Sequence, residues 1–126
     1  MRSRIYAVGL LLAVLGSAVL VRGAGRLPVG VAGAEQSVGE RTLLDNERVM
    51  MIEFVFPGGF RGEEHSAVAD EFAYVLDGEF AVVTQGKGKR VLRRGEVEYA
   101  NKGTVHYSLN ESKKPARVLV VLLKGR

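Results

Sequence analysis

The chain contains no cysteine, and this absence removes several classes of site at once. Without thiols there is no disulfide bridge, no thiolate metal site, no cysteine nucleophile and no lipidated cysteine. Cysteine usage therefore says nothing about the redox compartment in which the protein works. Histidine is nearly as scarce, because the sequence contains only His65 and His106. This scarcity directs attention to the sequence around each imidazole.

Acidic residues are absent from the first 34 positions, and this explains the formal net charge of +4. The four arginines of residues 1–34 supply the whole excess, whereas Lys and Arg balance Asp and Glu in residues 35–126. Nucleic-acid binding usually requires a basic face on the folded domain. Because the body of the chain is formally neutral, we expect no nucleic-acid partner.

Residues 1–34 have the organisation of an export segment. A positive start over residues 1–4 precedes the uncharged, largely apolar residues 5–21, and Ala32-Gly-Ala34 has the small-x-small form that signal peptidase cuts after. The apolar run also reaches the lower end of the ~17–25 residues that span a bilayer. We predict a signal peptide or, alternatively, an uncleaved anchor that contacts the membrane through residues 5–21. In both cases the folded domain lies outside the cytoplasm, either periplasmic or secreted.

The sequence after residue 35 has no segment with convincing helical periodicity. Short apolar or alternating runs are instead separated by turns rich in glycine. The runs predicted as strands are residues 48–56, 72–76, 79–84, 89–93, 97–100, 104–109 and 117–123. Strands this numerous and evenly spaced are typical of a sandwich or barrel, so residues 35–126 are predicted to form one all-β domain. Exposed strand edges on so small a domain also favour pairing with a second copy, which predicts a homodimer.

The sequence allows more specific predictions for two turns and one strand. Asp77-Gly78 is a strong hairpin signal, so we predict that residues 72–76 and 79–84 pair with each other. Residues 85–89 predict a second tight turn. The final run, residues 117–123, is almost continuously apolar, which predicts a strand that is buried on both faces.

Each histidine lies within a stretch that is framed by glycine. The framed positions are Gly59, His65, Glu71 and Gly78 in the first stretch, and Gly95, Gly103, His106 and Asn110 in the second. We interpret the glycines as structural and Asn110 as a residue that fixes a turn. Neutral imidazole with a nearby carboxylate is a common ligand set for a divalent transition metal.

The two stretches resemble the paired motifs of the cupin superfamily. The first family motif is Gly, five residues, His-x-His, three or four residues, Glu, six residues, Gly; the second is Gly, five residues, Pro-x-Gly, two residues, His, three residues, Asn. Eight of these ten positions match, in the family's order and with its usual compact gap. The resemblance covers roughly residues 48–123. It implies a small cupin-type β-barrel, a double-stranded β-helix or jelly roll, whose mouth or interior commonly holds a metal.

Two positions depart from the family pattern. Asn101 replaces a proline at a turn, where asparagine is also well suited. Ala67 replaces the second histidine, which is a metal ligand in the family, and residues two apart on a strand face the same side. The resemblance thus implies His65, Glu71 and His106 as metal ligands, with an alanine in place of a fourth.

Two imidazoles and one carboxylate are also the ligand set of the facial triad in non-haem iron enzymes. Two outcomes follow from the missing ligand. A divalent transition metal (iron, manganese, nickel or zinc) binds with a more open coordination sphere, or the metal has been lost and a polar pocket remains. Glu63 shares the strand parity of His65 and is an alternative ligand.

These features predict an exported cupin-like protein whose partner is a small molecule. As an enzyme it would be a metal-dependent lyase, isomerase or dioxygenase. Such chemistry needs a nearby base, with an unligated Glu71, Glu63 or one of Tyr74, Tyr99 and Tyr107 as candidates. The alternatives are a ligand-binding or sensory barrel without catalysis and a metal-free structural barrel.

Overall fold

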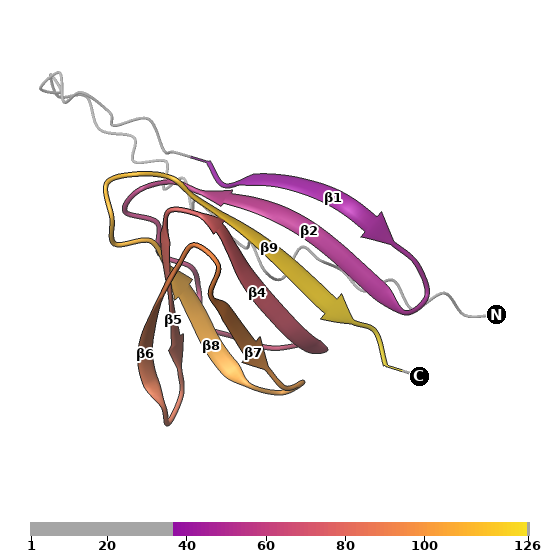
Figure 1. Ribbon diagram of the computed structural model, residues 1–126. Helices are drawn as coiled ribbons and strands as arrows, with labels where there is room; N and C mark the ends of the chain where they lie inside the picture. The colour runs from indigo at the N-terminus through magenta and orange to yellow at the C-terminus, as the bar shows by residue number, and fades with distance from the viewer. Residues whose placement is uncertain (1–36, 126) are drawn as a thin grey trace, which may run out of the picture.

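The computed structural model describes residues 37–125, which form nine β-strands and no helix. The strands are β1 (Gly39–Asp45), β2 (Val49–Phe56), β3 (His65–Ser66), β4 (Asp70–Asp77), β5 (Glu79–Thr84), β6 (Gly88–Arg93), β7 (Val97–Ala100), β8 (Val105–Leu109) and β9 (Ala116–Leu123). They form a five-stranded sheet in the order β1-β2-β9-β4-β7 and a four-stranded sheet in the order β3-β8-β5-β6 (Figure 1). All strand pairs are antiparallel. The prediction of an all-β domain is confirmed.

The hydrophobic core is built from one face of each sheet. β2 buries every second residue, because successive side chains of a strand point to opposite faces. The same alternation in β9 buries Val118 and Val120 in the hydrophobic core. The four-stranded sheet contributes Phe80, Val82 and Leu92 to the same cluster. Burying an apolar side chain of this size stabilises the fold by roughly 1.5–3 kcal/mol, so the shared core holds the two sheets together.

The hairpin predicted at Asp77-Gly78 is wrong. β4 pairs with β7 and β9, whereas β5, which begins at Glu79, belongs to the other sheet. The chain therefore crosses between sheets at Gly78, which has a φ of 81°. A Cβ atom there would lie 2.7 Å from the carbonyl oxygen of Pro115. A sheet crossing and a hairpin both use positive φ, so the local signal does not separate them. The turn predicted over residues 85–89 does join a hairpin, between β5 and β6.

β9 lies in the middle of the five-stranded sheet but is buried on one face only. Its outward residues Leu119 and Val121 are half-buried, and Leu123 is exposed. The prediction that this strand is buried on both faces is therefore wrong for its outer face. The apolar outer row continues across the sheet, because Val121 pairs with Met51 on one side and with Phe72 on the other.

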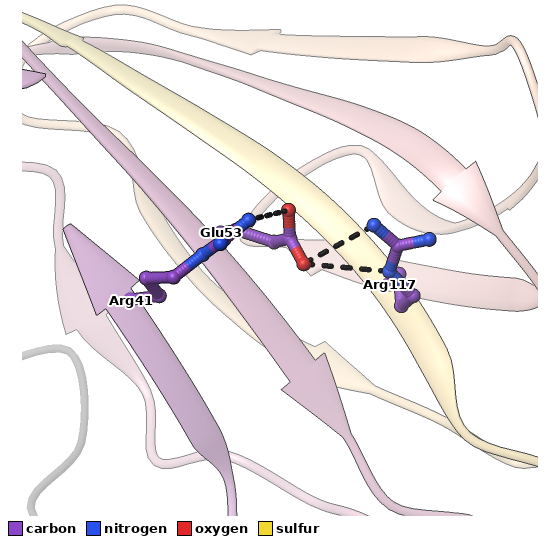
Figure 2. A network of polar contacts seen from close by, with 3 residues as sticks. All are labelled: Arg41, Glu53 and Arg117. Atoms are coloured by element: carbon purple, nitrogen blue, oxygen red, sulfur yellow. Dashed lines mark hydrogen bonds and ion pairs between the residues drawn. The ribbon is translucent and has the colours of Figure 1, made fainter. Parts of the chain in front are cut away.

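An ion-pair network ties three strands together on this outer face. Glu53 of β2 accepts hydrogen bonds from Arg41 of β1 at 3.3 Å and from Arg117 of β9 at 3.2 Å (Figure 2). Partial burial acts to raise the pKa of the Glu53 carboxyl, but the hydrogen bonds and charges of Arg117 and Arg41 outweigh it. The pKa of Glu53 consequently lies below its ordinary value of 4.5.

The predicted signal peptide or membrane anchor, residues 1–34, lies outside the described residues. Within residues 37–125, no helix offers the length and apolarity that a membrane crossing requires.

Candidate metal centre

The two histidines are brought face to face by a short strand pair. His65 begins β3 and pairs directly with His106 of β8 in antiparallel register. Directly opposed side chains on antiparallel strands lie on the same face of the sheet. The two rings accordingly meet edge to face, with their centroids 4.7 Å apart. Strand register thus joins two residues that are far apart in the sequence.

Glu71 approaches the histidines from the other sheet. It lies on β4, paired with Ala100 and Leu122, and its side chain is 11% exposed. Its Oε1 atom lies 2.9 Å from Nε2 of His106. One potential ligand atom from each of the three residues lies within 4.8 Å of the other two. The three predicted site residues therefore form one cluster that bridges the two sheets, and we call this cluster the triad.

The ring nitrogens of the triad have little else to bind. In the described part of the chain, the buried side-chain nitrogen and oxygen atoms without a hydrogen-bond partner are Nε2 of His65 and both ring nitrogens of His106. The 2.9 Å approach between His106 and Glu71 does not have the direction of a hydrogen bond. Two ligand atoms about 2.1 Å from one metal ion, at right angles, would lie ~3.0 Å apart. The contact thus fits two ligands that point at a common ion.

The orientation of His65 is fixed by the backbone next to it. Its Nδ1 atom lies 3.1 Å from the carbonyl oxygen of Glu63, an acceptor that requires the proton on Nδ1. The lone pair is then on Nε2, the buried nitrogen that has no partner. Ligand histidines in metalloproteins are commonly oriented in this way. Glu63 thus orients His65 through its backbone carbonyl. Its side chain is exposed and does not belong to the triad. The interpretation of Glu63 as an alternative metal ligand is therefore not supported.

Position 67 is closed and apolar. Ala67 is 3% exposed, and its backbone is held on both sides by the loop before β8, through its N–H to Thr104 and its carbonyl to Gly103. The short strand β3 ends at Ser66, before this position. No fourth ligand enters the cluster from here, as the alanine in the sequence predicts.

A pocket with two lobes opens beside the triad. The triad lobe is lined by all three triad residues, by Glu98 and Ser108, and by apolar residues of both sheets, and it is open to solvent on one side. The phenylalanine lobe is lined by Phe54, Phe56 and Phe60 together with residues 62, 63, 65 and 108. The two lobes share Phe56, His65 and Ser108, so we treat them as one pocket.

Glu98 is a pocket residue that the sequence analysis missed. It lies on β7 with a side chain that is 19% exposed, and Nη1 of Arg90 approaches its Oε2 atom at 2.5 Å. The signal was present in the alternation of β7, because Ala100 is buried and Glu98 shares its face. The three tyrosines proposed as candidate bases are absent from the pocket lining, and Tyr74 and Tyr99 are exposed.

The structural interpretation of the other framed residues is supported by their geometry. Asn110 is 1% exposed; its Nδ2 donates to the carbonyls of Phe56 and Lys114, and its Oδ1 accepts from Ser112. The amide thus bonds within the β8–β9 connection and to the end of β2. The four framing glycines all have positive φ, as turns require.

Comparison with known proteins identifies the family of the described domain. The family model described as "Cupin domain" matches residues 51–122. This span contains both histidines, the carboxylate of the triad and six of the nine strands in full. No match was found among curated proteins.

Several solved structures share the fold at low sequence identity. A cupin superfamily protein from Desulfitobacterium hafniense is 20% identical, with a TM-score of 0.65 over 83% of this chain and 95% of that one. KdgF from Halomonas sp. is 23% identical, with a TM-score of 0.63 over 71% of this chain and 80% of that one. The DMSP lyase DddQ from Ruegeria pomeroyi is 20% identical, with a TM-score of 0.64 over 68% of this chain but only 46% of that one.

Proposed function

Because the chain belongs to the cupin domain family, we propose that it binds one divalent transition metal through His65, Glu71 and His106 and acts on a small molecule in the adjoining pocket. The two sheets are then the two halves of the family's jelly-roll barrel. Iron, manganese, nickel and zinc all accept imidazole and carboxylate ligands, so the donor set is compatible with each of them.

The observation that carries the proposal is the set of partnerless ring nitrogens on the two histidines. A buried polar atom without a partner costs about 1–3 kcal/mol, so folded proteins rarely keep one without a use. Here all such atoms of the described chain are gathered on two residues that face each other beside a buried carboxylate. One metal ion would bind one of these nitrogens on each ring, which leaves a single partnerless nitrogen on His106.

The proposed chemistry divides between the metal and the protein. When bound, the metal supplies Lewis acidity or a site for oxygen at its open coordination positions. The apolar walls of the pocket exclude water around the reacting group. Glu98 lies in the same lobe as the triad and is paired with Arg90, and its carboxylate is the candidate to accept a proton from a bound molecule. These parts suit a lyase, an isomerase or a dioxygenase.

The second candidate function is ligand binding without catalysis, as in a sensory barrel. It is favoured by one observation, namely that Glu98 is the only carboxylate of the triad lobe outside the triad and is already paired with Arg90. A metal-free structural barrel is the weaker alternative, because it leaves the partnerless histidines without a role.

Two further proposals concern the location of the protein and its oligomeric state. We place the domain outside the cytoplasm, periplasmic or secreted, on the strength of the export-type sequence of residues 1–34, with membrane anchoring as the alternative. After cleavage, the N-terminal sequence of the exported product would begin near Glu35, whereas an intact Met1 in the membrane fraction indicates an anchor.

A homodimer is proposed from the exposed edge strand β1. Light scattering on the purified protein measures the oligomeric state.

Metal analysis tests the proposed function. The protein, purified without a histidine tag under aerobic and anaerobic conditions, is loaded with Mn, Fe, Ni or Zn and compared with His65→Ala and His106→Ala. We expect about one equivalent of one metal in the wild type and loss of it in both variants, with Glu63→Gln as a control that retains it. Absence of stoichiometric metal under every condition contradicts the proposal. Screening neutral and anionic organic molecules for turnover then separates an enzyme from a binding protein.

A further inference from the structure

We infer that the outer face of the five-stranded sheet packs against the same face of a second copy of this chain. The inference names the surface of the homodimer and therefore rests on that part of the proposed function. It places the contact on the face of the sheet and not along the free edge of β1.

The outer face of this sheet is apolar across its full width. The core takes up the other face, because residues such as Ile52 and Val118 are buried and their neighbours along each strand point outward. In one outward row Leu119 pairs with Tyr74, and Tyr74 pairs with Val97. The adjacent row crosses all five strands through directly paired residues, which are Leu44, Met51, Val121, Phe72 and Tyr99.

Much of this face is open to solvent in the single chain. Of the eight large apolar side chains that are exposed in the described residues, five lie on this face and are 39% to 47% exposed, namely Leu44, Tyr74, Val97, Tyr99 and Leu123. A contiguous apolar patch on the surface of a small domain commonly marks an interaction surface.

The size of the face matches the requirement of a stable dimer. Five strands spaced about 4.8 Å apart, with up to seven residues at about 3.4 Å each, give a footprint of roughly 500–600 Å². Two such faces in contact bury about 1,000–1,200 Å² in total, which is the lower bound for specific protein interfaces.

The two halves of the face complement each other, and this favours a second copy as the occupant. The half formed by β1 and β2 carries the guanidinium of Arg41 and the thioether of Met51 (Figure 2 shows Arg41 on this face). The half formed by β4 and β7 carries the rings of Phe72, Tyr74 and Tyr99. A two-fold axis along β9, the central strand, lays each half over the opposite half of the partner. Guanidinium and thioether groups both bind favourably to aromatic rings, so the patch has the self-complementarity that a closed dimer needs.

The charged groups of the face do not oppose this packing. Glu53 is paired with Arg41 and Arg117. Asp70, at the end of β4, accepts two hydrogen bonds within its own chain. A charged group that keeps its partners is covered at a much lower cost than an isolated one.

Charges of opposite sign at one position test the two-fold arrangement. Val121 lies on β9, where the axis passes, so its side chain faces its own copy in the partner. We expect Val121→Lys and Val121→Glu each to weaken the dimer by about 100-fold or more, because like charges then meet at the axis. An equimolar mixture of the two variants should restore the dimer, since lysine then meets glutamate. Light scattering on the exported protein, purified as the host releases it, measures all these samples.

The matched control makes the same change in the other sheet. Val91 is an exposed valine of β6, so Val91→Lys adds the same charge outside the proposed contact and should leave the dimer intact. A dimer that Val121→Lys leaves unchanged would overturn the inference. A mixture of the lysine and glutamate variants that stays monomeric would also count against it.

Cross-linking separates packing through the face from pairing through the edge. Because the chain contains no cysteine, a single introduced thiol reports on one position. A short bis-maleimide spans the ~10 Å between packed sheets, so Val121→Cys should join two copies of the full-length chain. Leu43→Cys, on the edge strand β1, should not.

The outcomes distinguish failure of the inference from failure of the proposed homodimer. Cross-linking through Leu43→Cys alone would show edge pairing, which overturns the inference and leaves the homodimer in place. A monomeric wild type overturns both. A monomer whose Val121→Cys thiol resists maleimide would show that another part of the same chain covers the face.

Discussion

His65 and His106 stand directly opposite each other on neighbouring antiparallel strands, and their rings meet 4.7 Å apart beside the carboxylate of Glu71. This relationship depends on the register of β3 and β8, a two-residue pairing at the edge of the four-stranded sheet. The two histidines are therefore positioned by the shortest strand pairing in the described domain. A metal ion that links His65 and His106 to Glu71 would also join the two sheets, so metal binding and folding stability should be coupled.

Replacing two residues of the triad, His106 and Glu71, with apolar residues should stabilise the metal-free protein. His106 and Glu71 are both buried, and neither ring nitrogen of His106 has a hydrogen-bond partner. Replacing such a pair with apolar residues of similar volume typically stabilises a protein by about 1–4 kcal/mol. We therefore expect His106→Leu with Glu71→Leu to unfold at higher urea concentration than the metal-free wild type. A loss of stability in the double variant would show that the pair serves the core and not a site.

Glycine is required at the sheet crossing for two reasons, which a pair of variants separates. Gly78 and Gly86 have nearly the same φ, 81° and 79°, but only Gly78 has backbone atoms close to the position of a Cβ. Gly86→Ala should lose about 1 kcal/mol from backbone strain alone. Gly78→Ala should lose clearly more, because its Cβ would also lie 2.7 Å from the carbonyl oxygen of Pro115. Denaturant unfolding measures both, and equal losses would refute the role of the close approach.

Asn110 is expected to matter for stability and not for metal binding. Asn110→Ala removes the amide donor to the carbonyl of Phe56 and one of two side-chain donors to the carbonyl of Lys114, at a cost of about 2 kcal/mol. Metal affinity, measured by competition with a chelator, should stay within about threefold of the wild type, because the amide bonds to the β8–β9 connection and the end of β2 and to no residue of the triad. A variant of normal stability with greatly weakened metal binding would assign Asn110 to the site instead.

Acid weakens the outer ion-pair network. The pKa of Glu53 is lower in the folded protein than its ordinary value, so the unfolded chain takes up the proton first as the pH falls. The stability that Glu53 contributes is present above pH 4.5 and is lost as the pH falls through the lower folded pKa. Glu53→Gln should be less stable than the wild type at pH 7, with a difference that shrinks below pH 4.5. Urea midpoints measured from pH 3 to 7 test this, with Glu47→Gln, a change at an exposed residue, as the control. A difference that is independent of pH would contradict the assignment.

The sequence was sufficient to predict the all-β class and the three residues of the triad. Strand periodicity and glycine spacing are local signals, and the resemblance to cupins supplied the pairing of two distant stretches. The hairpin at Gly78 was predicted wrongly because positive φ marks a sharp turn but does not say which sheet the next strand joins. β1 was missed because its sequence alternates weakly and it is exposed along its whole length.

The pocket was the feature least accessible to sequence reasoning. Phe54 and Phe56 have the ordinary pattern of core residues, and only their contact with Phe60, in the loop after β2, shows that they form a wall beside the triad. Glu98 has the appearance of a surface charge until the alternation of β7 and its ion pair with Arg90 place it in the pocket. These contacts join residues from several strands, and no regular spacing of residues along the sequence indicates them.

X-ray absorption at the edge of the bound metal tests the central claim most directly, because it reports the ligands of the ion itself. We predict a first shell that contains two histidine imidazoles at about 2.0–2.1 Å and one carboxylate, completed by oxygen atoms from solvent. His106→Ala should remove one of the two imidazole contributions. A first shell without histidine, or one that is unchanged in His106→Ala, would contradict the assignment of the triad as the metal site.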